Sequence, residues 1–452
     1  MEILKVANFF LSAIIPGFFL FLLLTKNERF AKIFVWPVAY ALGVFFISSQ
    51  IFIYLFIFQA NFNFLAFSSL LILETLVLAF FSRHRCQSFF FDKKAPVVRE
   101  KVKMLDGLLM TSVITCVIFA LSGALSRTPI FYDSLSMWLF KAKVIYFGNR
   151  VSLDVNNPLF LGGGGHLDYP WHIQLLEFWL FKVVGEYKDV LANWIFFAYF
   201  LSLLGTLFYF IKRFLSDSRL AWLGLFFFSS MPLILPHTYS PYADLPLSLS
   251  VLIASAASVL YLKEKKPLDL VWVSIFWAIA FWTKDTAILF FLPFALVSFW
   301  FFWREKHLKD LVRPAIYFSL LVLPWMFFKV THNLDFNNVG YGLGFHPAAI
   351  KAFFQAMFLA GSWNIWWYIV LAAFIFDFKK IFSSSFLRFG WSLLFSFIVT
   401  LLAMYAFTER YLYAVDQTAV YRNLLILIPF SIVLVLISVN NMRDSSNLTL
   451  EG

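Results

Sequence analysis

The sequence is poor in charged residues. Only 13% of its 452 residues are Asp, Glu, Lys or Arg, about half of the share found in soluble domains. This deficit excludes a soluble protein made of several ordinary domains, which the length alone would predict. Apolar residues take their place, making up 62% of the chain, and Phe alone occupies 62 positions. The composition therefore predicts a polytopic membrane protein.

Cysteines and binding motifs are also scarce. Cys86 lies in a basic segment and Cys116 in an apolar run, which excludes a disulfide framework and a cysteine-based metal site. No Lys-Ser or Lys-Thr follows the four glycines at 162–165, so that segment is not a phosphate-binding loop. The net charge of +11 is divided among short segments. Because no continuous basic stripe forms, nucleic acid is excluded as a partner.

Long apolar runs recur along the chain, with the length of about 20 residues that crosses the hydrocarbon core of a bilayer. We therefore predict an all-α transmembrane bundle of about 13 spans. The first run is longer than the apolar part of a usual signal peptide and no small-x-small cleavage site follows it, so we count it as a membrane helix. The predicted spans are Val6–Leu24, Ile33–Phe58, Phe64–Phe81, Leu105–Leu125, Val190–Ile211, Leu220–Pro236, Leu245–Leu262, Leu268–Trp282, Thr286–Trp303, Pro314–Val330, Trp363–Phe378, Phe389–Phe407 and Asn423–Val439.

The segments between the spans alternate in basic content. One set, together with the C-terminal tail, holds 24 of the 36 Lys and Arg residues, and the positive-inside rule makes this set cytoplasmic. The N-terminus is then outside and the C-terminus inside. The opposite set contains two long loops, 126–189 and 331–362, which we expect on the extracytoplasmic face. The short loops and the absence of eukaryotic sorting signals favour a bacterial inner membrane.

The first long loop contains two further helical patterns. The segment Trp171–Val184 is apolar but too short to cross a bilayer, which predicts a helix in the membrane interface. A second set of residues recurs with helical spacing and predicts an amphipathic helix along the membrane surface. This set is Leu135, Trp138, Leu139, Ala142, Ile145 and Tyr146.

Two acidic residues on the predicted outer face are candidates for catalysis. Asp133 precedes the surface helix, where a carboxylate can act as a general base or simply cap the helix. Asp244 stands before an apolar helix with Pro246 in its first turn, so helix capping is again the alternative.

Three cations on the same face are candidates for binding a donor phosphate. Lys284 stands at the outer end of a span, against the charge bias; the alternatives are an exposed ion pair at that helix end, beside Asp285, or snorkelling. Arg410 and Arg422 flank the last spans, and arginine suits phosphate recognition.

Polar and aromatic neighbours of these residues are candidates for binding the sugar or the acceptor. They are Tyr132, Trp138, His166, Asp168, Tyr169, His237 and Tyr242. The spacing of His166, Asp168 and His172 matches no strong metal motif. We therefore assign no metal ligand and no definite cofactor, and a divalent metal stays an open alternative that no strong motif supports.

The order of several short motifs resembles that of the membrane-embedded GT-C glycosyltransferases, in particular the branch of protein O-mannosyltransferases and bacterial lipid A aminoarabinose transferases. The similarity extends from Leu105 to about Val330 and departs from the family in having a single acid, Asp133-Ser134, where members often have two. The motifs are Asp133 with its Trp-containing surface helix, Pro170-Trp171, Asp244-Leu245-Pro246, Thr283-Lys284 and Leu323-Pro324-Trp325.

This resemblance implies a transferase that moves a sugar from a polyprenyl-phosphate carrier to a lipid, glycan or protein acceptor, with inversion at the anomeric carbon. Asp133 would be the catalytic carboxylate and Asp244 the second acid. Lys284, Arg410 and Arg422 would bind the phosphate. The chain would then divide into accessory helices at 1–104, a catalytic module at 105–330, and a second outer loop with the last helices at 331–452.

Two other functions share much of this pattern. A transporter or flippase of lipid-linked glycans would carry ionisable residues inside its spans, and few occur here, Glu74 being one. The acids gather instead at the outer ends of helices, which favours chemistry at the interface. A polymerase or ligase of surface glycans would use the same donor class, so the sequence separates it poorly from a glycosyltransferase.

Overall fold

The computed structural model describes residues 2–25, 32–91, 104–151, 153, 166–334 and 342–450. Over these ranges the chain is helical without any strand, and one isolated bridge joins Leu343 and Thr408. The predicted all-α fold is therefore confirmed for the described residues. The glycine run at 162–165 and the basic residues at 92–103 lie outside them.

The chain forms two units. Unit 1 comprises Met1–Leu167, Trp171–Thr206 and Thr238–Ala243, and unit 2 comprises Asp168–Pro170, Leu207–His237 and Asp244–Gly452. These units divide the chain differently from the three parts proposed above, at 1–104, 105–330 and 331–452. That functional division stays a prediction.

Nine helices within the described ranges are long and apolar enough to cross a membrane, and they coincide with nine of the predicted spans. Unit 1 contains α1 (Glu2–Thr25), α2 (Lys32–Phe52) with the π-helical turn η1 (Ile53–Ile57), α3 (Phe64–Phe91), α4 (Met104–Ser126) and most of α7 (Asp189–Leu215). Unit 2 contains α10 (Asp244–Glu264), α12 (Ala287–Arg304), α13 (Val312–Thr331) after the 3₁₀ turn η4 (Leu308–Leu311), and α17 (Ser385–Phe407).

The other four predicted spans form shorter helices. They are α8 (Ser218–Ser229), α11 (Pro267–Thr283), α15 (Trp366–Phe376) and the apolar part of α20 (Ile428–Leu450). The predicted span Leu220–Pro236 is interrupted after Ser229, before the short helix α9 (Ile234–His237). A count of 13 spans, and the side of the membrane on which each end lies, stay predictions.

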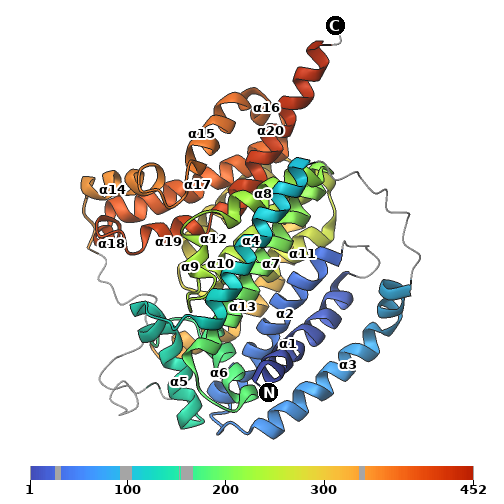
Figure 1. The fold of residues 1–452 in the computed structure, drawn as a ribbon, viewed down its shortest axis with the longest axis vertical. Coiled ribbons are helices and arrows are strands. Elements are labelled where there is room, and N and C mark those ends of the chain that lie inside the picture. The colour runs from blue at the N-terminus through green and yellow to red at the C-terminus, as the bar shows by residue number, and fades with distance from the viewer. Residues whose placement is uncertain are drawn as a thin grey trace. The chain divides into compact units, whose positions relative to one another are not determined.

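Small residues let α1 and α2 pack closely in unit 1, where the two helices run side by side (Figure 1). A Cβ atom on Gly17 would lie 1.9 Å from the carbonyl oxygen of Ala39, and one on Gly43 would lie 1.8 Å from that of Ala13. Each helix thus contributes a small-x-x-x-small pair, which lets two membrane helices approach and gain van der Waals contact.

The short helix predicted at Trp171–Val184 is present as α6 (His172–Val184). It packs against α1, α2 and α5 (Leu139–Gly148), and nearly all of its side chains are buried. A helix that lies in the membrane interface would leave one face to water and headgroups. The expected short helix is confirmed, and protein buries most of its side chains instead of leaving such a face exposed. Its place relative to the membrane stays a prediction.

The predicted surface helix begins with a π-helical turn, η2 (Ser134–Trp138), and continues as α5. Trp138, Leu139, Ala142 and Ile145 are buried on one face, as the pattern predicts. Leu135 is instead exposed, because the π turn holds an extra residue and shifts the helical register.

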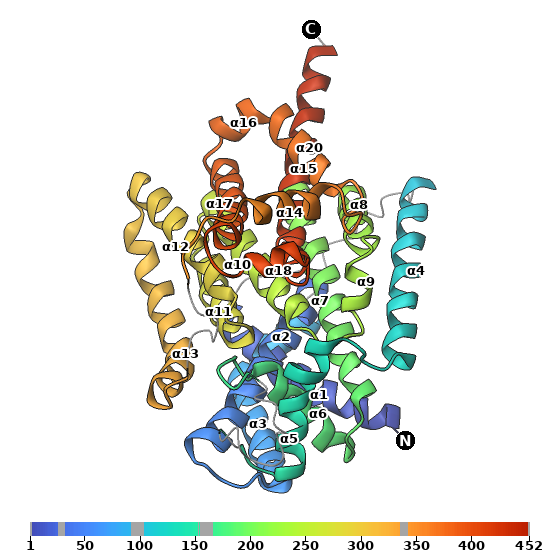
Figure 2. The same cartoon turned by 90° about the vertical axis from the view of Figure 1, so that its left-hand side faces the viewer.

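Helix α10 occupies the core of unit 2. Every residue from Asp244 to Leu262 is buried, and α11, α17 and α20 pack around it (Figure 2). Apolar and small side chains on all faces suit a helix that is enclosed by other helices. This packing places Asp244, the first residue of α10, inside the protein.

Candidate functional site

A buried carboxylate joins three segments of unit 2. Asp244 is fully buried, and its Oδ1 accepts a hydrogen bond of 2.7 Å from Nζ of Lys284, which directly follows α11. Its Oδ2 accepts one of 2.8 Å from Nε of Arg422, in α19 (Val420–Leu425). Two of the three predicted phosphate ligands therefore surround the second predicted acid. We call these three residues the Asp244 cluster.

The Asp244 cluster carries more positive than negative charge. The side chains of Lys284 and Arg422 are only 8% and 15% exposed, so both cations are largely removed from water. Such desolvation is compensated only when ion pairs are close and hydrogen-bonded, as they are here. One carboxylate shared by two cations leaves a net charge of +1.

His237 completes the surroundings of this carboxylate. Its Nε2 lies 3.7 Å from Oδ2 of Asp244, and its Nδ1 lies 2.9 Å from the carbonyl oxygen of Leu233. Burial lowers the pKa of His237 below its usual value, although Asp244 acts in the opposite direction. The ring is therefore neutral at pH 7 and adds no charge to the cluster.

A second ion pair lies at the next residue of the chain. Oδ2 of Asp285 is 3.0 Å from Nζ of Lys329, which is fully buried in the last turn of α13. Lys284 and Asp285 therefore do not form the exposed ion pair that was one alternative, because Lys284 is buried and pairs with Asp244. Lys329 could have been predicted as a site residue, because it is another cation at the predicted outer end of a helix.

Tyr169 lies close enough to Asp285 and Arg422 for their charges to affect its pKa. Burial raises its pKa to about 12, with a further increase from Asp285 and an opposing effect from Arg410. The phenol therefore stays protonated and can donate a hydrogen bond at neutral pH. Tyr169 is thus a predicted sugar-binding residue on which Asp285, Arg410 and Arg422 all act.

A cavity of about 820 Å³ lies beside Asp285. Residues of α11, α12, α13 and α17 form its wall, and most of them are apolar. The polar exceptions are Asp285, Thr286, Thr400, Thr408 and Arg410. Within the described part of the chain, no carboxylate forms an ion pair with Arg410. The cavity thus combines an apolar wall with one cation that no described carboxylate neutralises.

The remaining predicted site residues belong mostly to unit 1. Asp133 is half-buried before η2, and its side chain makes no capping hydrogen bond to that turn. Trp138 is fully buried, whereas Tyr132 and His166 are exposed. Tyr242 packs against Phe131, with 5.7 Å between ring centroids. The grouping of Asp133 with Asp244, and the sugar contacts of these residues, stay predictions. Asp168, buried in unit 2, stays a candidate as well.

Glu177 is a buried acid that sequence reasoning missed. It lies in α6 and is fully buried, and neither carboxylate oxygen has a hydrogen-bond partner among the described residues. Burial raises its pKa well above the usual value, although buried Lys141 acts in the opposite direction. Burial therefore favours the neutral form of this side chain. Its position within an apolar run gave no sequence signal beyond the charge itself.

Within the described residues, no group of three or more His, Cys, Asp or Glu side chains is placed to hold a metal ion. In comparisons with known proteins, no family model, no curated protein and no solved structure matches the chain. The resemblance to the GT-C glycosyltransferases therefore stays a prediction that rests on the order of residues and motifs.

Proposed function

We propose that this protein is an integral membrane glycosyltransferase that transfers a sugar from a polyprenyl-phosphate donor to an acceptor on the extracytoplasmic face. The observation that supports this most is the cavity of about 820 Å³, which is largely apolar but includes Arg410 in its wall. A lipid-linked phosphate needs this combination of an apolar wall for its tail and a guanidinium for its anionic group.

The size of the cavity is consistent with part of such a donor. Its volume falls within the range of about 300–1,000 Å³ of small-ligand sites. It would hold the phosphate end and the first isoprene units, while the rest of the tail lies along the helices in the bilayer. Burying these units against the apolar wall would favour binding by about 25 cal/mol for each Å² of apolar surface that is removed from water.

The cations would stabilise the phosphate as it leaves. Arg410 lines the cavity, and Lys284 and Arg422 are held in fixed orientations by Asp244. Charges that are oriented before the reaction stabilise a transition state without further reorganisation. In this proposal Asp244 acts by positioning the two cations, because both of its oxygens already accept hydrogen bonds from them.

Asp133 is the proposed general base, as the resemblance implies. Its carboxylate would take the proton of the acceptor hydroxyl while the hydroxyl oxygen bonds to the anomeric carbon. The bond from that carbon to the phosphate oxygen breaks, and its electron pair leaves with the polyprenyl phosphate. A single displacement of this kind inverts the anomeric centre. Asp285, which lines the cavity itself, is the competing candidate for the base.

The test uses purified protein in lipid vesicles with a panel of radiolabelled polyprenyl-phosphate sugars, and measures loss of label from the lipid. We expect Asp133→Asn to abolish transfer while the protein still accumulates in the membrane, and Asp285→Asn to keep measurable transfer. If Asp133→Asn is fully active and Asp285→Asn is inactive, the base is Asp285. If no donor in the panel loses label, the transferase proposal is wrong.

A flippase of lipid-linked glycans is the second candidate, and Glu177 is the observation that favours it. Buried protonatable acids occur in proton relays of membrane transporters, and Glu177 is fully buried without a hydrogen-bond partner among the described residues. The same vesicles separate the two functions. A flippase would move the labelled lipid between leaflets with its sugar still attached. A polymerase or ligase would differ only in using a glycan acceptor.

A further inference from the structure

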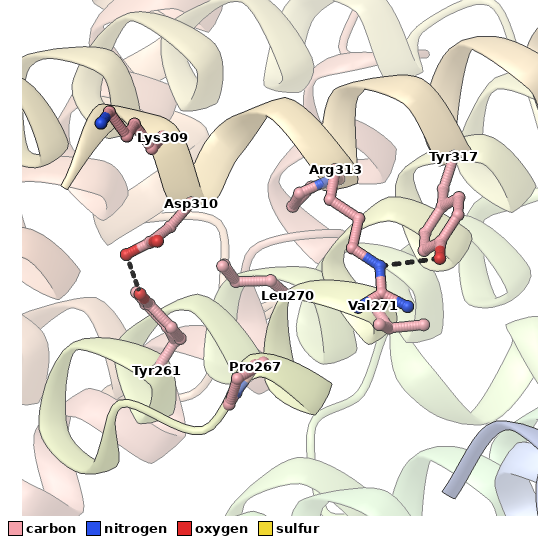
Figure 3. A pocket seen from close by; sticks show the side chains of 9 residues that line it. Tyr261, Pro267, Leu270, Val271, Lys309, Asp310, Arg313 and Tyr317 are labelled. Carbon is pink, nitrogen blue, oxygen red and sulfur yellow. Dashed lines mark hydrogen bonds between the residues drawn. The ribbon is translucent and has the colours of Figure 1, made fainter.

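A second cavity, of about 250 Å³, lies in unit 2 at the ends of three helices. It is formed by the last turns of α10, the first turns of α11, and the η4–α13 segment. Figure 3 shows the charged side chains of Lys309, Asp310 and Arg313 on the η4–α13 segment, with Tyr261 of α10 and Pro267 of α11 on the other side of the cavity. This end of the helices is the one for which the charge pattern predicts a cytoplasmic location.

Arg313 is held in place but keeps hydrogen-bonding capacity. Its Nε donates a hydrogen bond of 2.7 Å to the hydroxyl of Tyr317, and the guanidinium lies 5.3 Å from the centre of that ring. Within the described part of the chain, its two terminal amino groups have no partner. A guanidinium that is fixed in this way presents the fork geometry that binds two oxygens of a phosphate.

The other charged groups leave the cavity cationic. Lys309 is exposed and forms no ion pair with any described residue. Asp310 is already engaged, because it accepts hydrogen bonds from the hydroxyl of Tyr261 and from Nδ1 of His307, the latter at 3.0 Å. A phosphate in this cavity would thus meet two available cations and one carboxylate that is occupied by other donors.

The cavity also adjoins an apolar surface. Leu270 and Val271 line it from α11, and α13 carries an apolar stripe that begins at the same end. The residues of the stripe follow one another at three- or four-residue intervals and are each more than half exposed, so they share one face of α13. They are Val312, Ile316, Leu320, Leu323 and Phe327. A membrane helix presents such a face to lipid chains.

We infer that this cavity binds the phosphate group of an anionic membrane lipid. The volume corresponds to about eight water molecules at about 30 Å³ each, which fits a headgroup phosphate and its glycerol but not a whole lipid. The acyl chains would lie along the exposed stripe of α13. A free phosphate ion shares the chemistry of the headgroup but gains nothing from the stripe, and the lipid is therefore the better fit. Anionic lipids of the cytoplasmic leaflet attract basic residues near the membrane surface.

Native mass spectrometry of the full-length protein in detergent tests this inference with two lipids, phosphatidylglycerol and phosphatidylcholine. We expect preferential binding of phosphatidylglycerol. The double variant Lys309→Ala, Arg313→Ala should bind it about thirty-fold more weakly, which corresponds to about 2 kcal/mol at 1.4 kcal/mol for each factor of ten. Such a loss agrees with about 1 kcal/mol for each basic residue at the membrane surface.

The matched control is the double variant Arg304→Ala, Lys306→Ala, which removes two exposed cations that precede η4 and do not line the cavity. It should retain most of the preference. Arg313→Lys keeps the charge without the fork and should show an intermediate loss. Equal losses in the cavity variant and the control, or no loss in either, would overturn the inference. If inorganic phosphate alone displaces the lipid at equal concentration, the site binds a free ion and the lipid assignment is wrong.

Discussion

Replacing Asp244 with Asn preserves the shape of the side chain but removes the negative charge that Lys284 and Arg422 share. The two cations then face each other in the interior of unit 2, at 8% and 15% exposure. The amide oxygen of Asn can accept a hydrogen bond from one of them, but its NH₂ group is a donor and repels the other. The variant therefore removes the counter-charge that Asp244 supplies to both buried cations.

The size of the effect follows from the geometry of the Asp244 cluster. Removing one partner of a buried ion pair costs about 3–5 kcal/mol, because the other charge stays buried and uncompensated. Both bonds to Asp244 are short, at 2.7 and 2.8 Å, and both are lost or weakened together. We expect Asp244→Asn to lower the free energy of unfolding by about 3–5 kcal/mol. Adding Arg422→Gln should restore part of it, with a coupling of about 0.5–3 kcal/mol.

The assay is denaturant unfolding in detergent, followed by the fluorescence of the 16 Trp residues. The matched control is Asp416→Asn, since Asp416 is exposed and its side chain, among the described residues, accepts hydrogen bonds from Thr418 in its own turn and from no other residue. This control should change the free energy of unfolding by no more than about 0.5 kcal/mol. If Asp244→Asn is as mild as the control, or if the added Arg422→Gln makes it worse, the Asp244 cluster is not the stabilising unit described here.

Three further predictions concern other parts of the chain. Under the proposed function, Arg422→Ala should raise the KM for the lipid-phosphate donor, and an unchanged KM would remove Arg422 from the phosphate site. Gly17→Leu should separate α1 from α2 and lower the free energy of unfolding by at least about 1–3 kcal/mol, because a Cβ atom there would lie 1.9 Å from the carbonyl oxygen of Ala39. Gly107→Leu is the control, since a Cβ atom at that position meets nothing within 4 Å. Burial raises the pKa of Glu177 in the folded protein, so the folded state holds that proton more tightly than the unfolded chain. The stability of the wild-type protein therefore falls as the pH rises above the ordinary value of about 4.5 towards the raised pKa. Glu177→Gln should remove this fall, and an unchanged pH profile of unfolding would contradict the neutral, buried assignment.

Several features of the fold were predictable from local sequence. Nine apolar runs of sufficient length predicted nine long helices, and the shortness of Trp171–Val184 predicted a helix too short to cross a bilayer. These features depend on composition within one segment. The register of the surface helix was less predictable, since the π turn at Ser134–Trp138 exposes Leu135. The interruption after Ser229 was missed because its neighbours are as apolar as a span.

The candidate site was likewise predicted in part by the sequence and decided in part by the tertiary structure. The sequence alone indicated that Asp244, Lys284 and Arg422 stand at helix ends on one predicted face, because charges in an apolar chain are conspicuous. Only the tertiary structure decided their pairing, in which Lys284 binds Asp244 while its neighbour Asp285 binds Lys329. The partners of a buried charge depend on which helix ends meet, and packing between distant segments such as α10, α11 and α19 determines that. The low content of charged residues predicted a membrane protein, and the packing of its helices decided which of those few charges meet.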